Sequence, residues 1–151
     1  MRTVTTPQAA HILGMSFRTL DNWVRIGLAT CSQVAGGRGT RRAWTVDDVT
    51  RAAYIRALRK NGISTHQLNA MKKTSRLDTL LDGLLKQEKA HSDKNIFSVV
   101  ILIVEGKKLP VTTIGEKRKA VQKAFDALEA GLPPEPLTYD DAWSEIEVRV
   151  E

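Results

Sequence analysis

The chain has 151 residues and a mass of 16.8 kDa, a length that suits one compact domain or two small ones. With 42% hydrophobic and 26% charged residues, its composition excludes a disordered chain. The single cysteine, Cys31, excludes an internal disulfide and a cysteine-based zinc site. The N-terminus has no apolar signal segment and no apolar run is long enough to span a membrane, so we expect a cytoplasmic protein.

The positive charge is concentrated in the first half of the chain. The formal net charge is +6. Residues 1–73 hold twelve Lys and Arg residues against three acidic residues, whereas residues 131–151 hold one Arg and six acidic residues. This asymmetry predicts a polyanionic partner for the N-terminal half.

Two short helices separated by a tight turn are predicted near the N-terminus. Thr5 is a candidate N-cap with Pro7 in the first turn, and Gly14 ends the apolar pattern of this helix. Ser16 is a second candidate N-cap and opens a helix expected over residues 17–26.

The second of these helices has two different faces. At about 100° per residue, Phe17, Leu20 and Val24 share an apolar face that needs a core to bury it. The opposite face carries groups of the kind that hydrogen-bond phosphates and base edges. It consists of Arg18, Asp21, Asn22 and Arg25.

Residues 28–45 have the pattern of a β-hairpin, because the glycine-rich turn at 36–39 separates two short runs. Arg38, Arg41 and Arg42 lie at the tip of this hairpin and on its returning strand. These cations extend the basic surface beyond the helix that precedes them.

Three further helices follow the hairpin. Residues 45–60 are apolar most of the way round, which predicts a central packing helix. Ser64 and Gln67 have the spacing of a capping box for the next helix. The helix expected over 76–90 carries a stripe of leucines from Leu77 to Leu85, which is either core of this chain or a dimer interface.

The last third of the chain changes character. Residues 96–104 form a β-branched run typical of a buried strand, and residues 109–114 and 145–150 are predicted as further strands. Residues 116–130 have the apolar spacing of a helix. We therefore expect a small α+β unit at the C-terminal end.

Four stretches within residues 3–73 resemble the winged helix-turn-helix DNA-binding domain of the MerR family. MSFRTL at 15–20 and RIGL at 25–28 are similar to the start and end of that family's recognition helix. WTVDDV at 44–49 resembles the entry into its third helix, and RALRKNGIS at 56–64 the turn into its fourth. The Tyr pair and the Asn-Gly-Tyr wing that are frequent in the family are absent here.

The resemblance implies a recognition helix that enters the major groove of DNA, with Arg42 on the wing strand and Trp44 at its base. From the chemistry of the side chains, we expect Arg18 and Asn22 to read bases. Phosphate contacts are expected from Arg25 and the hairpin arginines. The predicted DNA-binding residues are Ser16, Arg18, Thr19, Asn22, Arg25, Arg38, Arg41 and Arg42. Trp23 and Trp44 are expected to pack in the core.

A second basic cluster lies in the C-terminal half of the chain. If it contacts DNA, one chain could bind an asymmetric site as a monomer with two DNA-contacting domains. This second candidate patch consists of Lys107, Lys108, Lys117, Arg118 and Lys119.

The predicted fold class is α+β, with three parts. The first is a winged helix-turn-helix DNA-binding domain over residues 1–73. The second is a connecting helix over 74–92, a candidate for dimerisation because the MerR family usually dimerises through a long helix at this point. The third is a small α+β domain over 93–151, for which the sequence indicates no role.

The predicted function is that of a sequence-specific regulator of transcription that binds double-stranded DNA, of bacterial, phage or mobile-element type and associated with the nucleoid. We expect a repressor, because occupying a promoter requires only binding. Two alternatives remain: an architectural DNA-binding protein of the excisionase or partition kind, and a protein-interaction or antitoxin module. No nucleophile–base pair or metal-ligand spacing is readable, so we expect no enzyme activity, metal or cofactor.

Overall fold

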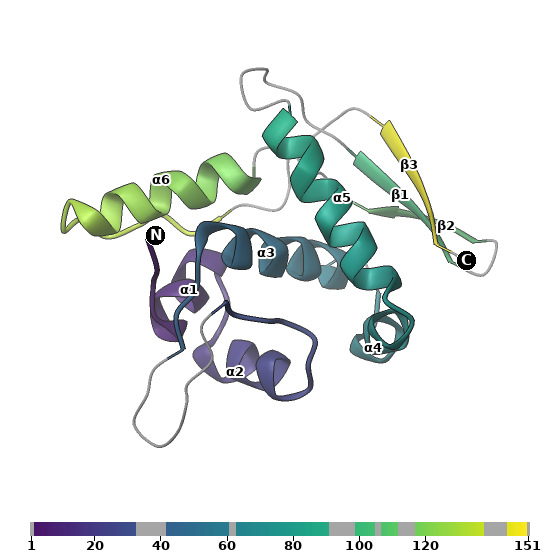
Figure 1. Ribbon diagram of the computed structural model, residues 1–151, viewed down its shortest axis with the longest axis horizontal. Coiled ribbons are helices and arrows are strands. Elements are labelled where there is room, and N and C mark those ends of the chain that lie inside the picture. The colour runs from purple at the N-terminus through teal and green to yellow at the C-terminus, as the bar shows by residue number, and fades with distance from the viewer. Residues whose placement is uncertain are drawn as a thin grey trace.

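The computed structural model describes residues 2–32, 42–60, 63–90, 99–104, 107–111, 117–137 and 145–150. Within these ranges the chain forms helices and one sheet, with α3 in the middle of the helices (Figure 1). The helices are α1 (Thr6–Leu13), α2 (Phe17–Arg25), α3 (Val46–Lys60), α4 (Thr65–Lys73), α5 (Arg76–Ala90) and α6 (Lys117–Glu129). The strands are β1 (Val99–Val104), β2 (Lys107–Val111) and β3 (Glu145–Val150).

The ends of the helices are set by the residues that the sequence indicated. Thr5 and Gln8 form a capping box at the start of α1, and Gly14 ends the helix with a left-handed φ of 69°. Ser64 and Gln67 form the predicted capping box of α4. These local hydrogen bonds explain why the predicted helix bounds agree with the observed ones to within a residue or two.

Helix α3 is the central packing helix that its sequence predicted. Most of its residues are buried, and Val49, Tyr54 and Leu58 have no measurable exposure. It packs against α1 on one side and against α5 and α6 on others. A helix that is apolar nearly all round is stable only when it is covered on nearly all sides, as α3 is here.

The leucine stripe of α5 lies in the core of the same chain. All five leucines are 5% exposed or less, and α5 packs against α3, α4 and α6. Of the two alternatives for this stripe, the in-chain core is therefore the one observed. These residues are Leu77, Leu80, Leu81, Leu84 and Leu85.

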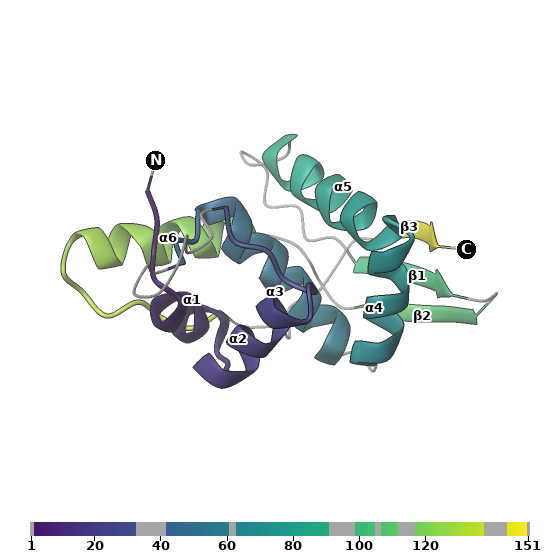
Figure 2. The same ribbon diagram turned by 60° about the horizontal axis from the view of Figure 1, so that its bottom comes forward.

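The predicted fold class, α+β with a small α+β domain at the C-terminal end, is wrong. Its helix, α6, packs against α3 and α5 and buries Val121, Ala124 and Phe125 in the core that α1 to α5 share. The sheet lies on the other side of α5 from α6 (Figures 1 and 2). Helices α1 to α6 therefore share one core. The prediction failed because the apolar face of a helix can be buried in any core within reach, and the sequence of the helix does not specify which core that is.

The strands pair with one another in the order β2-β1-β3. β1 runs antiparallel to β2, with Val100 opposite Val111, and parallel to β3, with Val100 opposite Ile146. A parallel pair needs a long crossover connection, and the chain between β1 and β3 includes β2 and α6. β3 lies at one edge of this sheet. The predicted strand residues 96–98 and 112–114 lie outside the described residues.

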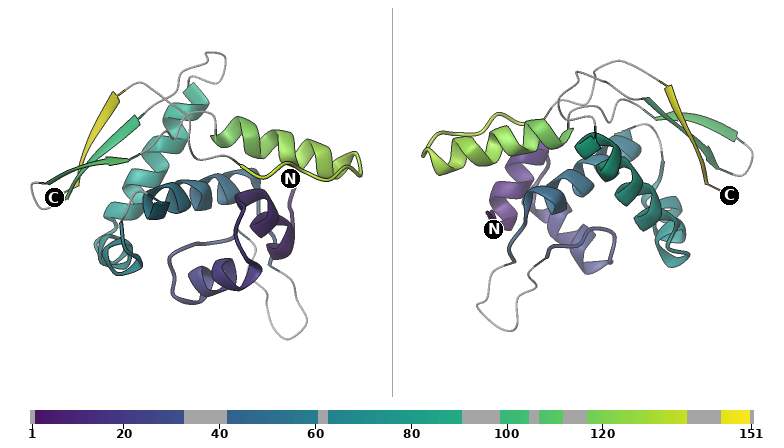
Figure 3. Two further views of the ribbon diagram at one scale, coloured as in Figure 1. Left: turned by 180° about the vertical axis from the view of Figure 1, so that it is seen from behind. Right: turned by 45° about the horizontal axis from the view of Figure 1, so that its top comes forward.

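The segment after α6 turns back along that helix and docks on α1 (Figure 3). The Leu137 amide donates to the Ile12 carbonyl over 2.9 Å, and His11 Nε2 lies 3.0 Å from the Pro134 carbonyl oxygen. Arg2 forms ion pairs with Asp126 and Glu129 of α6. These contacts join the N-terminal residues, up to and including α1, to α6 and the segment that follows it. In the described part of the chain, no helix is both long and apolar enough to cross a membrane.

Candidate nucleic-acid interface

Helices α1 and α2 form a helix-turn-helix, with Gly14, Met15 and Ser16 as the turn. The side chains of Leu20 and Trp23 hold α2 against the core, with 0% and 5% exposure. The amides of Leu28 and Ala29 both donate to the Trp23 carbonyl, which closes the end of α2. This packing leaves the opposite face of α2 on the surface of the molecule (Figure 2).

The surface face of α2 presents the polar residues that the sequence singled out. Arg18, Thr19, Asn22 and Arg25 are all exposed. Arg18 makes no ion pair with any residue in the described part of the chain, so its guanidinium is available to an external anion. Cations and amides on one exposed helix face are suited to phosphate oxygens and base edges.

Ser16 is the N-cap of α2, as expected. Its Oγ accepts a hydrogen bond from the Thr19 amide over 3.1 Å and lies 2.8 Å from Thr19 Oγ1. The first turn of α2 is therefore held by its own side chains, while the remaining N-terminal amides carry the positive end of the helix dipole. This positive end lies on the same surface as Arg18.

Asp21 is a functional residue candidate that sequence reasoning placed on this face without giving it a role. One of its oxygens lies 3.1 Å from an Arg25 nitrogen, and the other accepts a hydrogen bond from Arg42 Nη1. The Asp21 side chain is only 18% exposed. It therefore joins α2 to Arg42, which follows the predicted wing tip in the sequence. The i,i+4 spacing of Asp21 and Arg25 was the signal available in the sequence.

The base of the predicted wing is described, but its tip is not. Trp44 pairs with Val4 through two backbone hydrogen bonds of 2.8 and 2.9 Å, and Trp44 Nε1 donates to Thr6 Oγ1 over 3.0 Å. Trp44 is fully buried, which confirms the expected packing role for this residue and for Trp23. Arg38 and Arg41, like the glycine-rich turn, lie outside the described residues.

Phe17 does not lie in the core, contrary to the prediction of an apolar face shared with Leu20 and Val24. It is 51% exposed, whereas Leu20 is fully buried and Val24 is partly buried against the core. Phe17 is the first residue of α2, so it stands at the edge of the contact between this helix and the core. Periodicity alone does not show where along a helix that contact begins.

The second candidate patch is not one exposed surface. Lys117 is buried at 3% exposure, and Arg118 Nε lies 3.4 Å from an Asp47 oxygen of α3. Lys119 is half-buried. Lys107 and Lys108 belong to β2, on the sheet beyond α5 (Figure 1). The structure thus separates the two halves of this cluster.

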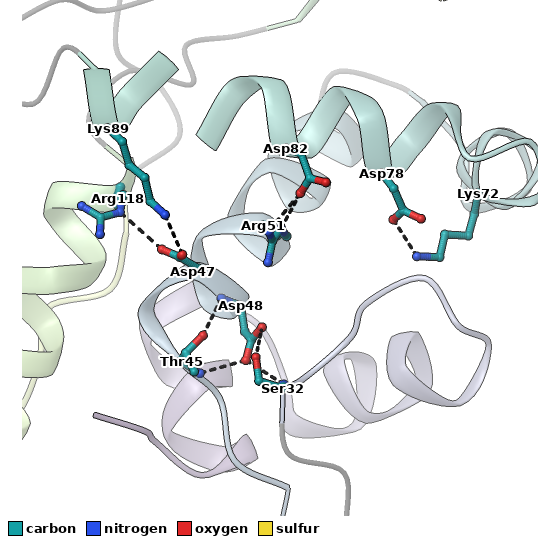
Figure 4. Close-up of polar contacts among 10 residues, drawn as sticks. All are labelled: Ser32, Thr45, Asp47, Asp48, Arg51, Lys72, Asp78, Asp82, Lys89 and Arg118. Carbon is teal, nitrogen blue, oxygen red and sulfur yellow. Dashed lines mark hydrogen bonds and ion pairs between the residues drawn. The ribbon is translucent and has the colours of Figure 1, made fainter. Parts of the chain in front are cut away.

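Ion pairs join α3 to the helices that cover it (Figure 4). Asp47 lies 2.8 Å from Lys89 Nζ of α5 as well as near Arg118, and Arg51 pairs with Asp82 of α5 over 2.9 Å. Burial raises the pKa of Asp47, but the hydrogen bonds and charges of Lys89 and Arg118 outweigh it, so the pKa lies below its ordinary value. These pairs fix α5 and α6 on the back of the helix-turn-helix unit.

The start of α3 is tied to the loop after α2 by one carboxylate. Asp48 accepts hydrogen bonds from the Ser32 amide and hydroxyl and from the Thr45 amide, over 2.8 to 2.9 Å. Thr45 in turn caps the Asp48 amide. Asp48 therefore acts as a capping residue at the start of α3. Among the described residues, no group of three or more His, Cys, Asp and Glu side chains is placed to hold a metal ion.

The arrangement of α1 to α4 defines a helix-turn-helix protein whose second helix presents a basic face. Residues 4–73 match the family described as the MerR HTH family regulatory protein, which confirms the predicted resemblance over 3–73.

Similar proteins support the same family. A stretch of 63 residues is 33% identical to uncharacterized HTH-type transcriptional regulators from Mycobacterium bovis and from two strains of Mycobacterium tuberculosis. It covers 41% of this chain but only 28% of each relative. The shared part is therefore a segment of longer proteins.

Proposed function

We propose that this chain is a regulator of transcription that binds double-stranded DNA, with α2 as its recognition helix. The observation that carries the proposal is the exposed polar face of α2 in a segment that matches the MerR regulatory family. Helix-turn-helix proteins place the second helix in the major groove, with its N-terminal residues at the base edges.

We assign a role to each residue of the interface from its chemistry and, where it is described, its position. Arg18, the second residue of α2, and Asn22, one turn further on, are both exposed and read bases, since Arg pairs bidentately with guanine and Asn with adenine. Arg25 and Arg42, which both pair with Asp21, contact phosphates beside the groove. Ser16 and Thr19, at the start of α2, contact the phosphate backbone of the DNA. Arg38 and Arg41 of the wing are assigned to phosphates from the sequence alone.

The regulatory mode that we propose is repression by a protein of bacterial, phage or mobile-element origin. Binding across a promoter blocks polymerase without any further activity. Because the leucines of α5 are buried within one chain, we propose that a single chain binds a single unrepeated site rather than a palindrome. Separation of the second basic cluster into a buried and a distant part favours one DNA-contacting surface, on α2 and the wing.

The decisive experiment is selection of bound duplexes from a random pool, followed by titration of the selected site against variants. Arg18→Ala and Asn22→Ala should each lose about 1–3 kcal/mol, and the preference at one base pair should relax. Arg25→Ala should weaken binding to all sequences and lower the slope of log K against log salt by about one. Lys86→Ala, which removes an exposed cation of α5, is the matched control and should bind like the parent.

The outcomes separate the candidate functions. A single asymmetric site upstream of a reporter gene, with lower expression when the protein is present, supports the monomeric repressor. A palindromic site supports a dimer, and several phased sites with strong bending support an architectural role. If Arg18→Ala and Arg42→Ala both bound duplex DNA as tightly as the parent, the DNA-binding proposal would be wrong.

A further inference from the structure

Phe17 is a large apolar side chain left on the surface at the start of the recognition helix. It is 51% exposed although Leu20, three residues further on the same helix, is fully buried. An isolated exposed apolar residue is common on protein surfaces. Phe17 differs because its immediate neighbours, Ser16 and Arg18, belong to the proposed DNA interface.

The surroundings of Phe17 restrict the partner that could cover it. The side chains exposed beside it are polar or cationic, and the positive end of α2 lies at the same place. The charge therefore suits a polyanion that also presents a small apolar group. In the major groove of duplex DNA, that group is the C5-methyl of thymine, which phenylalanine is suited to contact.

The position along the helix agrees with this partner. Residues at the N-terminal end of a recognition helix reach the base edges, and Phe17 is the first residue of α2. We propose that Phe17 is a specificity-determining residue that packs on the methyl group of a thymine next to the bases read by Arg18 and Asn22. This inference rests on the proposed function and names part of the sequence that the site selects.

The test removes the methyl group from the DNA and the ring from the protein separately. The selected duplex is prepared with each thymine in turn replaced by deoxyuridine, which pairs identically but lacks the C5-methyl. The parent should bind one such duplex roughly fourfold more weakly, the effect of one buried methyl group. Phe17→Ala should bind the thymine and uracil duplexes equally.

A matched control comes from the other end of α2. Ile26 is 41% exposed at the C-terminal cap, so Ile26→Ala removes a similar amount of exposed apolar surface. It should keep the preference of the parent for thymine over uracil. Thermal unfolding of Phe17→Ala should match the parent, because the ring contributes little to the core.

Each result tests either the role of Phe17 or the proposed DNA-binding function. Equal binding of all thymine and uracil duplexes by the parent, or an unchanged thymine preference in Phe17→Ala, would overturn the role of Phe17 and leave sequence-specific DNA binding intact. If the parent preferred no duplex in the random pool, the proposed function itself would fail.

Discussion

Truncating Phe125 tests whether α6 belongs to the core of the helix-turn-helix unit. Phe125 is 2% exposed and lies in the same buried cluster as the core residues of α1 to α5. A buried Phe→Ala substitution removes about 3–5 kcal/mol from the free energy of unfolding. For a chain of this length each kcal/mol corresponds to about 2–4 °C in Tm. We therefore expect Phe125→Ala to lower Tm by about 10 °C.

The assay should follow the N-terminal half while the perturbation lies in the C-terminal half. In a Trp143→Phe background, tryptophan fluorescence comes from Trp23 and Trp44 alone, both of which are buried near α1 and α2. Urea unfolding followed by this signal should shift with Phe125→Ala as one cooperative transition. Phe17→Ala, an exposed Phe in α2, should change stability by less than about 0.5 kcal/mol. An unshifted tryptophan midpoint in Phe125→Ala would refute the shared core.

Three further predictions follow from individual contacts. Asp21→Asn removes the negative charge that pairs with Arg25 and Arg42, so both arginines become available to phosphates. Affinity for random duplex DNA should rise, and its dependence on salt concentration should steepen. An unchanged ratio of specific to random binding in anisotropy titrations would contradict this. The lowered pKa of Asp47 means that its contribution is present above the unfolded pKa of about 3.9 and is lost as pH falls through the folded pKa. Asp47→Asn should therefore lower stability at neutral pH by about 1 kcal/mol or less and flatten the acid side of the stability profile; identical profiles in urea unfolding would exclude such a contribution. Leu81→Ala should cost about 2–5 kcal/mol with a Tm that does not depend on protein concentration, whereas a variant that stayed folded but lost a dimer in ultracentrifugation would place the leucine stripe between chains.

Local features of this fold could be predicted from the sequence because their causes are local. The capping residues Thr5, Ser16 and Ser64 and the left-handed Gly14 act within one turn of their own helix. Their residue types alone therefore located the helix starts and ends. The exposed polar residues of α2 followed in the same way from helical spacing, whereas the exposed Phe17 did not.

The placement of α6 could not be predicted, because it depends on contacts between segments far apart in the chain. The apolar spacing of Val121 and Phe125 predicts a buried face but not the surface that covers it. The sequence also gave no sign that Phe17 would fall outside the core or that Lys117 would be buried. In each case the local pattern was compatible with two environments, and tertiary packing decided between them.

Part of the positive charge of the N-terminal half is paired with acidic residues elsewhere in the folded chain. Two arginines of the N-terminal half pair with acidic residues of α6 and α5: Arg2 with Asp126, and Arg51 with Asp82. Asp126 belongs to α6 and Asp82 to α5, the two helices that pack against α3. Part of the excess positive charge thus serves to join the two halves of the chain.

The arginines on and beside α2 differ in whether a carboxylate pairs with them. Asp21 neutralises part of the charge of Arg25 and Arg42, whereas Arg18 has no such partner among the described residues. Non-specific DNA binding is governed by the number of cations that neutralise phosphates, and base reading by the placement of individual side chains. Under the proposed function, a carboxylate that restrains the two arginines assigned to phosphates while Arg18 stays unpaired would shift binding from general affinity toward sequence selection.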